Sequence, residues 1–277
     1  MESITIFWFR RDLRIDDNCG FFYALRENKN VLPIFIFDEN ILSKFSNDDP
    51  RIEFIYNSLI SLNNVFKKNK SSIQIYKGKP ENIFFELLKK YKIKSVYFNR
   101  DYEPSTIERD RLIKKLLISK KINVFDFKDH VIYEKNEIVK IDGTPYKIYT
   151  PYSKVWLNNF FSKTFVKYES EIYLKNLLKI IIDPQISFKS LGFKKSLIKI
   201  NQYKIDSNFL NDYESTRNFP IYDTSRLGLF LRFGIVSIRN IVDFATKSKD
   251  HTFLKQLIWR EFFIQILWYF PYTTKQS

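Results

Sequence analysis

Five short stretches rich in β-branched and aromatic residues recur through the first 130 residues, each separated from the next by a stretch with helical spacing of apolar residues. Strands that alternate with helices are typical of a parallel sheet wrapped by helices, and right-handed crossovers then give an open sheet. We therefore predict an α/β fold with an N-terminal five-stranded parallel open sheet and flanking helices. The predicted strands are Ile4–Phe9, Val31–Phe37, Ile73–Lys77, Ser95–Asn99 and Asn123–Phe127.

The carboxyl ends of these strands are the expected ligand site, because open α/β sheets usually bind ligands there. Arg10, Asp38 and Asn99–Asp101 stand at three of these ends. The six glycines never fall into a G-x-G-x-x-G pattern, which disfavours an ordinary nicotinamide-binding domain. The helices between the strands are predicted at about Asp17–Glu27, Arg51–Lys67, Pro80–Tyr91 and Pro104–Lys121.

The remaining chain divides into two regions with different patterns. Residues 131–205 show weak periodicity, lysine-rich segments and turn signals, which predicts a long interdomain connector with some short helices. Residues 206–277 are dominated by helical spacing, and there Ser237 suits an N-cap and Gly234 suits the end of the preceding helix. We predict an α/β domain at 1–130, a connector at 131–205 and an all-helical region at 206–277.

Composition argues against several kinds of site and location. Cys19 is the only cysteine, and His130 and His251 are the only histidines, so neither a disulfide nor a metal cluster is expected. No apolar run approaches the roughly 18 residues of a membrane span, and the first residues lack the pattern of a signal peptide. We expect a cytoplasmic protein with no membrane partner.

The net charge of +15 suggests contact with a phosphate backbone, because basic proteins release counterions when they bind nucleic acid. The charge is a weak signal here. Lysine outnumbers arginine 33 to 13 and only two alanines occur, a composition that a bias toward A and T in the codons would produce. On charge alone, solvated surface lysine and nucleic-acid binding both account for the excess.

Two loop motifs combine charged or hydroxyl groups with the start of a helix. In "FWFRRDLRIDDN" a buried strand ends in charge, Asp12 and Arg14 are placed to pair across a turn, and Asp17 or Asn18 can cap the next helix. In "YDTSRLGLFLRFG", Thr224 and Ser225 precede a helix whose free N–H groups suit a phosphate. Simple capping explains the second motif equally well.

The last helical stretch, "QLIWREFFIQILWYFP", places an Arg-Glu pair in an apolar run. Gln256, Trp259, Arg260 and Phe263 are spaced i, i+3, i+4, i+7 and therefore share one face. A buried guanidinium needs a partner, since an unpaired buried charge costs several kcal/mol. The partner is either a protein carboxylate or a bound anion, and Trp259 is equally compatible with a core position.

Taken together, these segments resemble the DNA photolyase and cryptochrome family. The resemblance covers essentially the whole chain in order. It is carried by "FWFRRDLRIDDN" at the start, "YTPYSKVW" at Tyr149–Trp156, "YESTRNFPIYDTSRLGLFLRFGIVS" at Tyr213–Ser237 and "FLKQLIWREFF" at Phe253–Phe263. The family joins an N-terminal α/β domain, which can hold a light-gathering antenna pigment, to a helical domain that binds FAD. The resemblance therefore implies that the helical region here is the first part of an FAD-binding domain.

The resemblance also implies roles for individual residues. The flavin-binding stretch of the family is matched by Tyr213, Thr224, Ser225, Arg226 and Leu227, with Thr224 and Ser225 at the phosphates. Arg260 matches the arginine beside the cofactor, Trp259 the aromatic residue that stacks on a flipped lesion, and Gln256 a lesion-contacting position. The charged pair is then expected because one helix face looks into a cofactor and DNA cavity. The implied chemistry is repair of pyrimidine dimers in UV-damaged DNA by light-driven electron transfer from reduced FAD.

Three departures from the family pattern leave alternatives open. Gly228 stands where the family commonly has a serine, and Gln256 stands at a position that is glutamate in many dimer photolyases and glutamine in other branches, which leaves the lesion type open. The remaining helices of the family have no counterpart here, so we expect a shortened photolyase that binds FAD weakly or not at all, and the activity of the chain alone stays open. We also expect a monomer. A folate antenna, a deazaflavin antenna and no antenna at all are each compatible with the sequence, which identifies none of them. The alternatives are a cryptochrome-like blue-light sensor and a non-enzymatic nucleotide-binding remnant.

Overall fold

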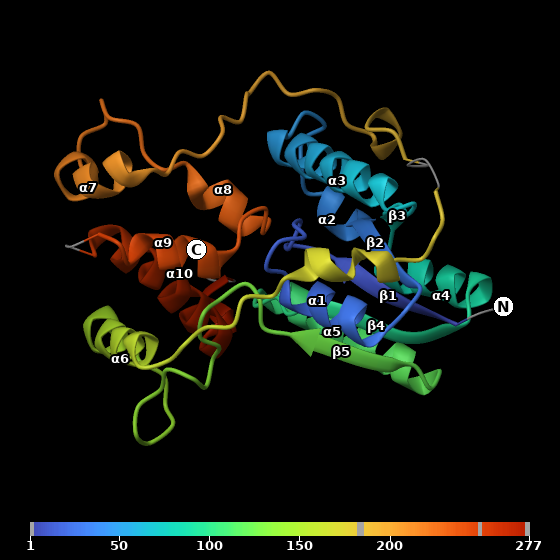
Figure 1. Ribbon diagram of the computed structural model, residues 1–277, viewed down its shortest axis with the longest axis horizontal. Coiled ribbons are helices and arrows are strands. Elements are labelled where there is room, and N and C mark those ends of the chain that lie inside the picture. The colour runs from blue at the N-terminus through green and yellow to red at the C-terminus, as the bar shows by residue number, and fades with distance from the viewer. Residues whose placement is uncertain (1–2, 182–185, 249–250, 275–277) are drawn as a thin grey trace.

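The structure is a computed structural model that describes residues 3–181, 186–248 and 251–274, and its N-terminal part has the predicted α/β fold (Figure 1). A five-stranded parallel sheet has the strand order β3-β2-β1-β4-β5. The strands are β1 (Ile4–Phe9), β2 (Val31–Asp38), β3 (Gln74–Gly78), β4 (Ile93–Asn99) and β5 (Asn123–Phe127). The sequence prediction of the sheet is confirmed, with each strand end within about two residues of its expected place.

Helices cover both faces of the sheet, because the side chains of the buried central strands alternate in direction. Phe7 and Phe9 of β1 join one core cluster with residues of α1 and α3. Ile6 and Trp8 join a second cluster with residues of α4 and α5 on the other face. The helices of this part are α1 (Cys19–Glu27), α2 (Glu39–Leu42), α3 (Pro50–Lys68), α4 (Pro80–Lys90) and α5 (Pro104–Ser119).

Local sequence signals fix the ends of several helices. Asn18 is the N-cap of α1 and accepts a hydrogen bond from the Phe21 amide, as one of the two predicted caps. Proline occupies the first position of α3, α4 and α5, where its fixed φ suits a helix and its missing N–H costs nothing. These caps place the loops that precede α1 and α5 at the carboxyl edge of the sheet.

The segment after β5 packs against both the C-terminal helices and the sheet. Its first part contains α6 (Tyr149–Phe161) and packs with the C-terminal helices through Tyr152 and Trp156. Its second part, with the 3-10 helices η1 (Ser170–Asn176) and η2 (Lys189–Leu191), packs against the sheet and α1. In Figure 1 it then crosses above α3 toward α7. The predicted domain limits at residues 130 and 205 stay a prediction.

Short helices and one long helix form the C-terminal part, which gathers at one end of the sheet (Figure 1). These elements are α7 (Ser207–Thr216), α8 (Leu227–Arg232), α9 (Ile238–Ala245), α10 (Thr252–Tyr269) and η3 (Pro271–Thr274). Ser237 caps α9 by accepting hydrogen bonds from the Arg239 and Asn240 amides, as predicted. No helix among the described residues is both long and apolar enough to cross a lipid bilayer.

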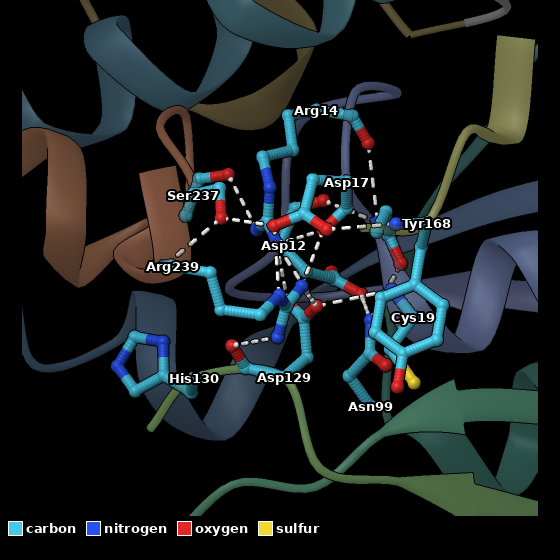
Figure 2. Close-up of polar contacts among 12 residues, drawn as sticks. Asp12, Arg14, Asp17, Cys19, Asn99, Asp129, His130, Tyr168, Ser237 and Arg239 are labelled. Atoms are coloured by element: carbon cyan, nitrogen blue, oxygen red, sulfur yellow. Dashed lines mark hydrogen bonds and ion pairs between the residues drawn. The ribbon is translucent and has the colours of Figure 1, made fainter. Parts of the chain in front are cut away.

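A buried cluster of ion pairs joins this helical part to the sheet (Figure 2). Arg239 of α9 contacts Asp17 at 2.7 Å and Asp129 at 2.8 Å, and Arg14 contacts Asp129 at 2.8 Å. Both carboxylates are almost fully buried. Burial raises the pKa of Asp129, but the positive charges of Arg14 and Arg239 outweigh it and hold that pKa at about 2. Asp129 is therefore ionised at neutral pH.

The loop between β1 and α1 lies at the centre of this contact between the sheet and the helical part. The pairing of its side chains differs from the prediction. The side chains of Asp12 and Arg14 do not pair with each other, although the Arg14 amide donates to the Asp12 carbonyl oxygen at 2.7 Å. Asp12 accepts hydrogen bonds from the Arg10 amide at 2.6 Å and from the Asn99 side chain at 2.6 Å. Arg14 turns instead to Asp129, a residue that sequence spacing could not place beside it. Burial is the main cause that raises the pKa of Asp12 to about 6.

Gly234 lets the helical part approach this loop closely. Its φ is +61°, and a Cβ at this position would lie 2.2 Å from the Arg11 carbonyl oxygen and 2.6 Å from the Asp12 Cα. The Leu13 amide donates a hydrogen bond to the Phe233 carbonyl at 3.1 Å beside it. Glycine is required here for both space and backbone conformation.

The glutamate of the Arg-Glu pair has a structural role that the sequence analysis did not foresee. Glu261 is 2% exposed and accepts hydrogen bonds from the Ile132 amide at 2.6 Å, the Tyr133 amide at 2.9 Å and the Trp156 Nε1 at 2.6 Å. Glu261 thus binds the segment after β5 and helix α6 onto α10. The expectation that both members of the pair face a cofactor and DNA cavity is wrong for Glu261.

Replacing Arg239 is expected to lower the free energy of unfolding by about 3–5 kcal/mol, because Asp17 and Asp129 would stay buried without this cation. Urea denaturation of Arg239→Ala at pH 7 measures the change. The control is Arg111→Ala, which removes an exposed ion pair to Glu108 and should leave the midpoint unchanged. Equal midpoints for the two variants would contradict the role of the buried cluster.

Glu261→Gln tests the buried carboxyl through pH. Burial, the largest influence, raises the pKa of Glu261 from 4.5 to about 7, so the folded state keeps the proton longer than the unfolded state. The resulting stabilisation is complete below pH 4.5 and is lost as pH rises through 7, a change on the order of 3 kcal/mol. Urea denaturation from pH 4.5 to 8 should show this loss in the wild type and not in the variant. The raised pKa of Asp12 affects the wild type and the variant equally. Parallel curves of unfolding free energy against pH for the two proteins would therefore refute the assignment of the pH dependence to Glu261.

Candidate functional site

A cavity of about 130 Å³ lies at the carboxyl ends of β1, β2 and β4. Arg10, Asp38 and Asp101 contribute to its wall, and all three belong to the positions that the sequence predicted for a ligand at this edge. Aromatic and aliphatic side chains line most of the rest. The other positively charged residues around the cavity are Arg11, Arg51, Arg109 and Arg232.

The charges around this cavity are held by ion pairs and leave donors free. Asp110 pairs with Arg10 and, at 2.9 Å, with Arg109, and the two guanidinium groups lie 5.1 and 4.9 Å from the ring centre of Trp8. The buried atoms Trp8 Nε1 and Arg10 Nε have no hydrogen-bond partner among the described residues. Burial raises the pKa of Asp38. Trp8 Nε1 and Arg10 Nε have almost no accessible surface, so the guanidinium groups of the arginines are what the wall offers to a ligand with carbonyl or anionic groups.

The size of the cavity limits what it can enclose. Pockets for whole drug-sized ligands usually measure about 300–1,000 Å³, and this cavity is smaller. It is too small to enclose a complete nucleotide. Within residues 3–181, 186–248 and 251–274, no three metal-ligating side chains come together.

Arg260 of α10 lies against the segment that follows β5. Its guanidinium donates to the His130 carbonyl oxygen at 3.0 Å and contacts His130 Nε2 at 2.8 Å. A guanidinium has donors only, so Nε2 must be the acceptor and the ring proton belongs on Nδ1. Burial first, and then the charge of Arg260, lowers the pKa of His130 well below its usual value. The histidine is therefore neutral and cannot repel the arginine.

The charge of Arg260 has no carboxylate partner in the described part of the chain. No ion pair within 4.0 Å joins it to an Asp or Glu there, and its neighbour Glu261 turns to backbone amides instead. Burial, as the largest cause, lowers the pKa of Arg260 to about 10, so the group stays cationic at neutral pH. Of the two partners considered from the sequence, a bound anion fits this arrangement better than a protein carboxylate.

Trp259 and Gln256 lie on the same part of α10. The Trp259 ring stacks on Tyr149 of α6 with 3.7 Å between ring centres and 7° between planes, and Phe263 lies 5.4 Å away at 27°. Both Trp259 and Gln256 are partly exposed, whereas Phe263 is 60% exposed. Trp259 is thus neither a fully buried core residue nor a free surface side chain.

The other residues predicted to bind a cofactor lie on two different elements. Tyr213 of α7 packs edge-on against Phe253 near the start of α10, with 5.1 Å between ring centres. Thr224 and Arg226 are exposed, Ser225 is partly buried, and Leu227 is buried in the helical core. Arg226 has φ +53° and pairs with Asp223 at 2.6 Å.

The predicted residues are therefore brought together only in part. Arg260, Trp259 and Gln256 share α10, and Tyr213 packs near its first turns. No hydrogen bond or ion pair between described residues joins Thr224 or Ser225 to Arg260. A common hollow for these groups stays a prediction. Sequence reasoning missed His130 and Tyr149 as partners of α10, because each lies more than 100 residues away and only "YTPYSKVW" hinted at the second.

Comparisons with known proteins identify the fold and the family. The family model described as DNA photolyase matches residues 5–168. The deoxyribodipyrimidine photo-lyase of Alkalihalophilus pseudofirmus is 26% identical over 98% of this chain and 60% of its own length, and that of Synechococcus is 24% identical over 98% and 62%.

Solved structures agree with the fold. The cryptochrome of Synechocystis superposes with a TM-score of 0.77 at 17% identity, covering 97% of this chain and 62% of its own. The archaeal photolyase of Sulfolobus tokodaii superposes with a TM-score of 0.74 at 23% identity, covering 98% and 60%. The chain thus spans about 60% of the length of these relatives. With a family model that covers more than half of its residues, the chain belongs to the DNA photolyase family.

Proposed function

We propose that this chain carries cofactor and lesion contacts of a light-driven DNA repair photolyase that binds FAD and splits cyclobutane pyrimidine dimers. The observation that carries the proposal is the cationic Arg260 side chain, which has no carboxylate partner in the described chain and lies one residue from Trp259 on α10. An anionic cofactor and an extruded base would use these two neighbours.

The residues present fit a bound dinucleotide. Arg260 has donors that its two contacts to His130 do not exhaust, since a guanidinium carries five N–H groups. A phosphate accepts such donors strongly. By the family resemblance, Thr224 and Ser225 would add hydroxyl donors at the phosphates, and Tyr213, Arg226 and Leu227 would line the same stretch.

The chemistry divides between cofactor and chain. Reduced FAD, when bound, supplies the electron that splits the dimer. Trp259 provides a flat surface on which an extruded base stacks, a contact worth about 1–3 kcal/mol per base. Gln256, one turn earlier on the same face, offers an amide that both donates to and accepts from a pyrimidine edge. The net charge of +15 favours the approach to damaged DNA.

The cavity at the sheet edge is proposed to hold the ring of an antenna pigment. Its excess of arginines favours a planar ligand with carbonyl groups or negative charge. Folate and deazaflavin both have this chemistry. The Sulfolobus tokodaii photolyase contains two FAD molecules, with the implication of a novel light-harvesting cofactor in that protein, which adds a flavin to the candidates.

Arg260→Ala is expected to weaken FAD binding by at least tenfold, because it removes charge-assisted hydrogen bonds worth about 1.5–3 kcal/mol. Titration of the 277-residue chain with FAD, followed by flavin fluorescence, measures the dissociation constant. We expect weak binding by the wild-type chain. Arg111→Ala is the control, since Arg111 pairs only with Glu108 on the exposed side of α5. Equal affinities for all three proteins would refute the role of Arg260.

An assay of dimer repair distinguishes a photolyase from a blue-light sensor and from a nucleotide-binding remnant. Blue light on the chain loaded with chemically reduced FAD, together with an oligonucleotide that contains one thymine dimer, should restore intact thymines. Flavin binding with a light-induced spectral change and no repair would favour a blue-light sensor. Binding of FAD or ADP without any response to light would favour a nucleotide-binding remnant.

Arg232→Ala tests the sheet-edge cavity. Arg232 lines the cavity from α8, and its side chain is half exposed, so its removal should not unfold the protein. We expect one of three probes, methenyltetrahydrofolate, 8-hydroxydeazaflavin or FAD, to bind with a shifted visible absorption, and the variant to bind it several-fold more weakly. Arg111→Ala should bind as the wild type does. If none of the probes binds, the antenna proposal fails and the Arg260 result is unaffected.

A further inference from the structure

The closest ring stack in the described chain joins Tyr149, the first residue of α6, to Trp259 in the middle of α10. The two rings are nearly parallel, at 7°, with 3.7 Å between their centres. Residues 110 positions apart in the chain are thus in full face-to-face contact. Offset or edge-on contacts at 4.5–7 Å are the more usual arrangement of aromatic pairs. At 3.7 Å the two parallel rings are in van der Waals contact, so neither can tilt toward the other without a clash.

A hydrogen bond anchors Tyr149 to the same part of α10. Its hydroxyl donates to the Lys255 carbonyl oxygen at 3.0 Å. In a regular α-helix the carbonyl four residues before Trp259 is that of Lys255, so the hydroxyl is held on the turn that carries the indole. Burial raises the pKa of Tyr149 to about 12, and the hydroxyl therefore remains a donor at neutral pH.

Other neighbours of Trp259 do not hold its plane in this way. Phe262 meets it edge-on at 82°, and Phe263 is inclined by 27° with 5.4 Å between ring centres. Phe263 is also 60% exposed, so it is free to change rotamer. Tyr149 is the neighbour that is both parallel to the indole and tied to the backbone beside it.

We propose that Tyr149 is a positioning residue that fixes the indole plane of Trp259 so that an extruded base meets a stacking surface already in place. This inference rests on the proposed repair function. A surface set before binding avoids the entropy cost of ordering a side chain during binding. Tyr149 acts through Trp259, and its hydroxyl serves to hold its own ring in place.

Three variants of the 277-residue chain test this role. Tyr149→Leu removes the ring, and Tyr149→Phe keeps the ring and removes the hydroxyl. Tyr146→Leu is the matched control, because Tyr146 is a partly buried tyrosine that packs on the same helical core without a ring contact to Trp259. Thermal unfolding of each variant establishes that the fold is retained.

The first readout is spectroscopic and independent of DNA. The near-ultraviolet circular dichroism of the Trp259 indole is obtained as the difference between each protein and its Trp259→Phe partner. We expect Tyr149→Leu to remove most of this difference signal, Tyr149→Phe to reduce it slightly and Tyr146→Leu to leave it intact. An unchanged signal in Tyr149→Leu overturns the inference.

The second readout is the ratio of affinities for two duplexes, one undamaged and one with a single thymine dimer. Tyr149→Leu should lower the affinity for the dimer duplex about tenfold, within the range of losing one base stack, and leave the affinity for the undamaged duplex unchanged. Tyr149→Phe should change either affinity less than twofold, and Tyr146→Leu should behave as the wild type does. Equal losses on both duplexes, or equal effects of the two leucine variants, would mean packing alone and overturn the positioning role.

The two readouts separate this inference from the function on which it rests. A wild-type chain that binds both duplexes equally refutes lesion recognition by this chain, and with it the purpose assigned to the fixed indole. A wild-type chain that prefers the dimer, together with Tyr149→Leu that keeps the preference and the Trp259 signal, refutes only the role of Tyr149.

Discussion

The joint between the sheet and the C-terminal helices depends on two buried carboxylates, Asp17 and Asp129, that share the charges of Arg14 and Arg239 (Figure 2). Burying four charges is unfavourable unless every one is paired and hydrogen-bonded. Here backbone amides complete the shell, since Tyr168 N–H donates to Asp17 and Cys19 N–H to Asp129. A shift of α9 would leave one or more of these buried charges unpaired, which is strongly unfavourable. The cluster therefore fixes the orientation of α9, and through it α10, relative to the strand ends.

Both candidate sites follow from that fixed orientation. The sheet-edge cavity lies between strand ends and α8, so Arg232 reaches it only because α8 is held against the β1–α1 loop at Gly234. On the other side of the joint, Arg260 meets His130, the residue next to Asp129. A single ionic joint thus sets the geometry of the proposed antenna cavity and of the proposed cofactor face. The rest of each site is built from local helix and loop structure.

Sequence reasoning succeeded where periodicity is local. The strands of the sheet, the cap at Ser237 and the turn at Gly234 were predicted because burial alternation, N-caps and left-handed glycines act over a few residues. It failed where a polar residue pairs with a residue that is distant in the sequence. Arg14 pairs with Asp129 rather than Asp12, and Glu261 accepts from Ile132 and Trp156. Nothing in the spacing of residues specifies such contacts, because tertiary packing decides them.

The contacts of Glu261 also bear on how the polypeptide matures during synthesis. Trp156 and the Ile132 amide leave the ribosome more than 100 residues before the side chain that satisfies them. Until α10 has been synthesised, it cannot cover the aromatic side chains of α6, and the Ile132 and Tyr133 amides can donate hydrogen bonds only to water. Nascent chains in this state are prone to self-association. Transient shielding by a chaperone would be most useful in the interval between the emergence of α6 and that of α10.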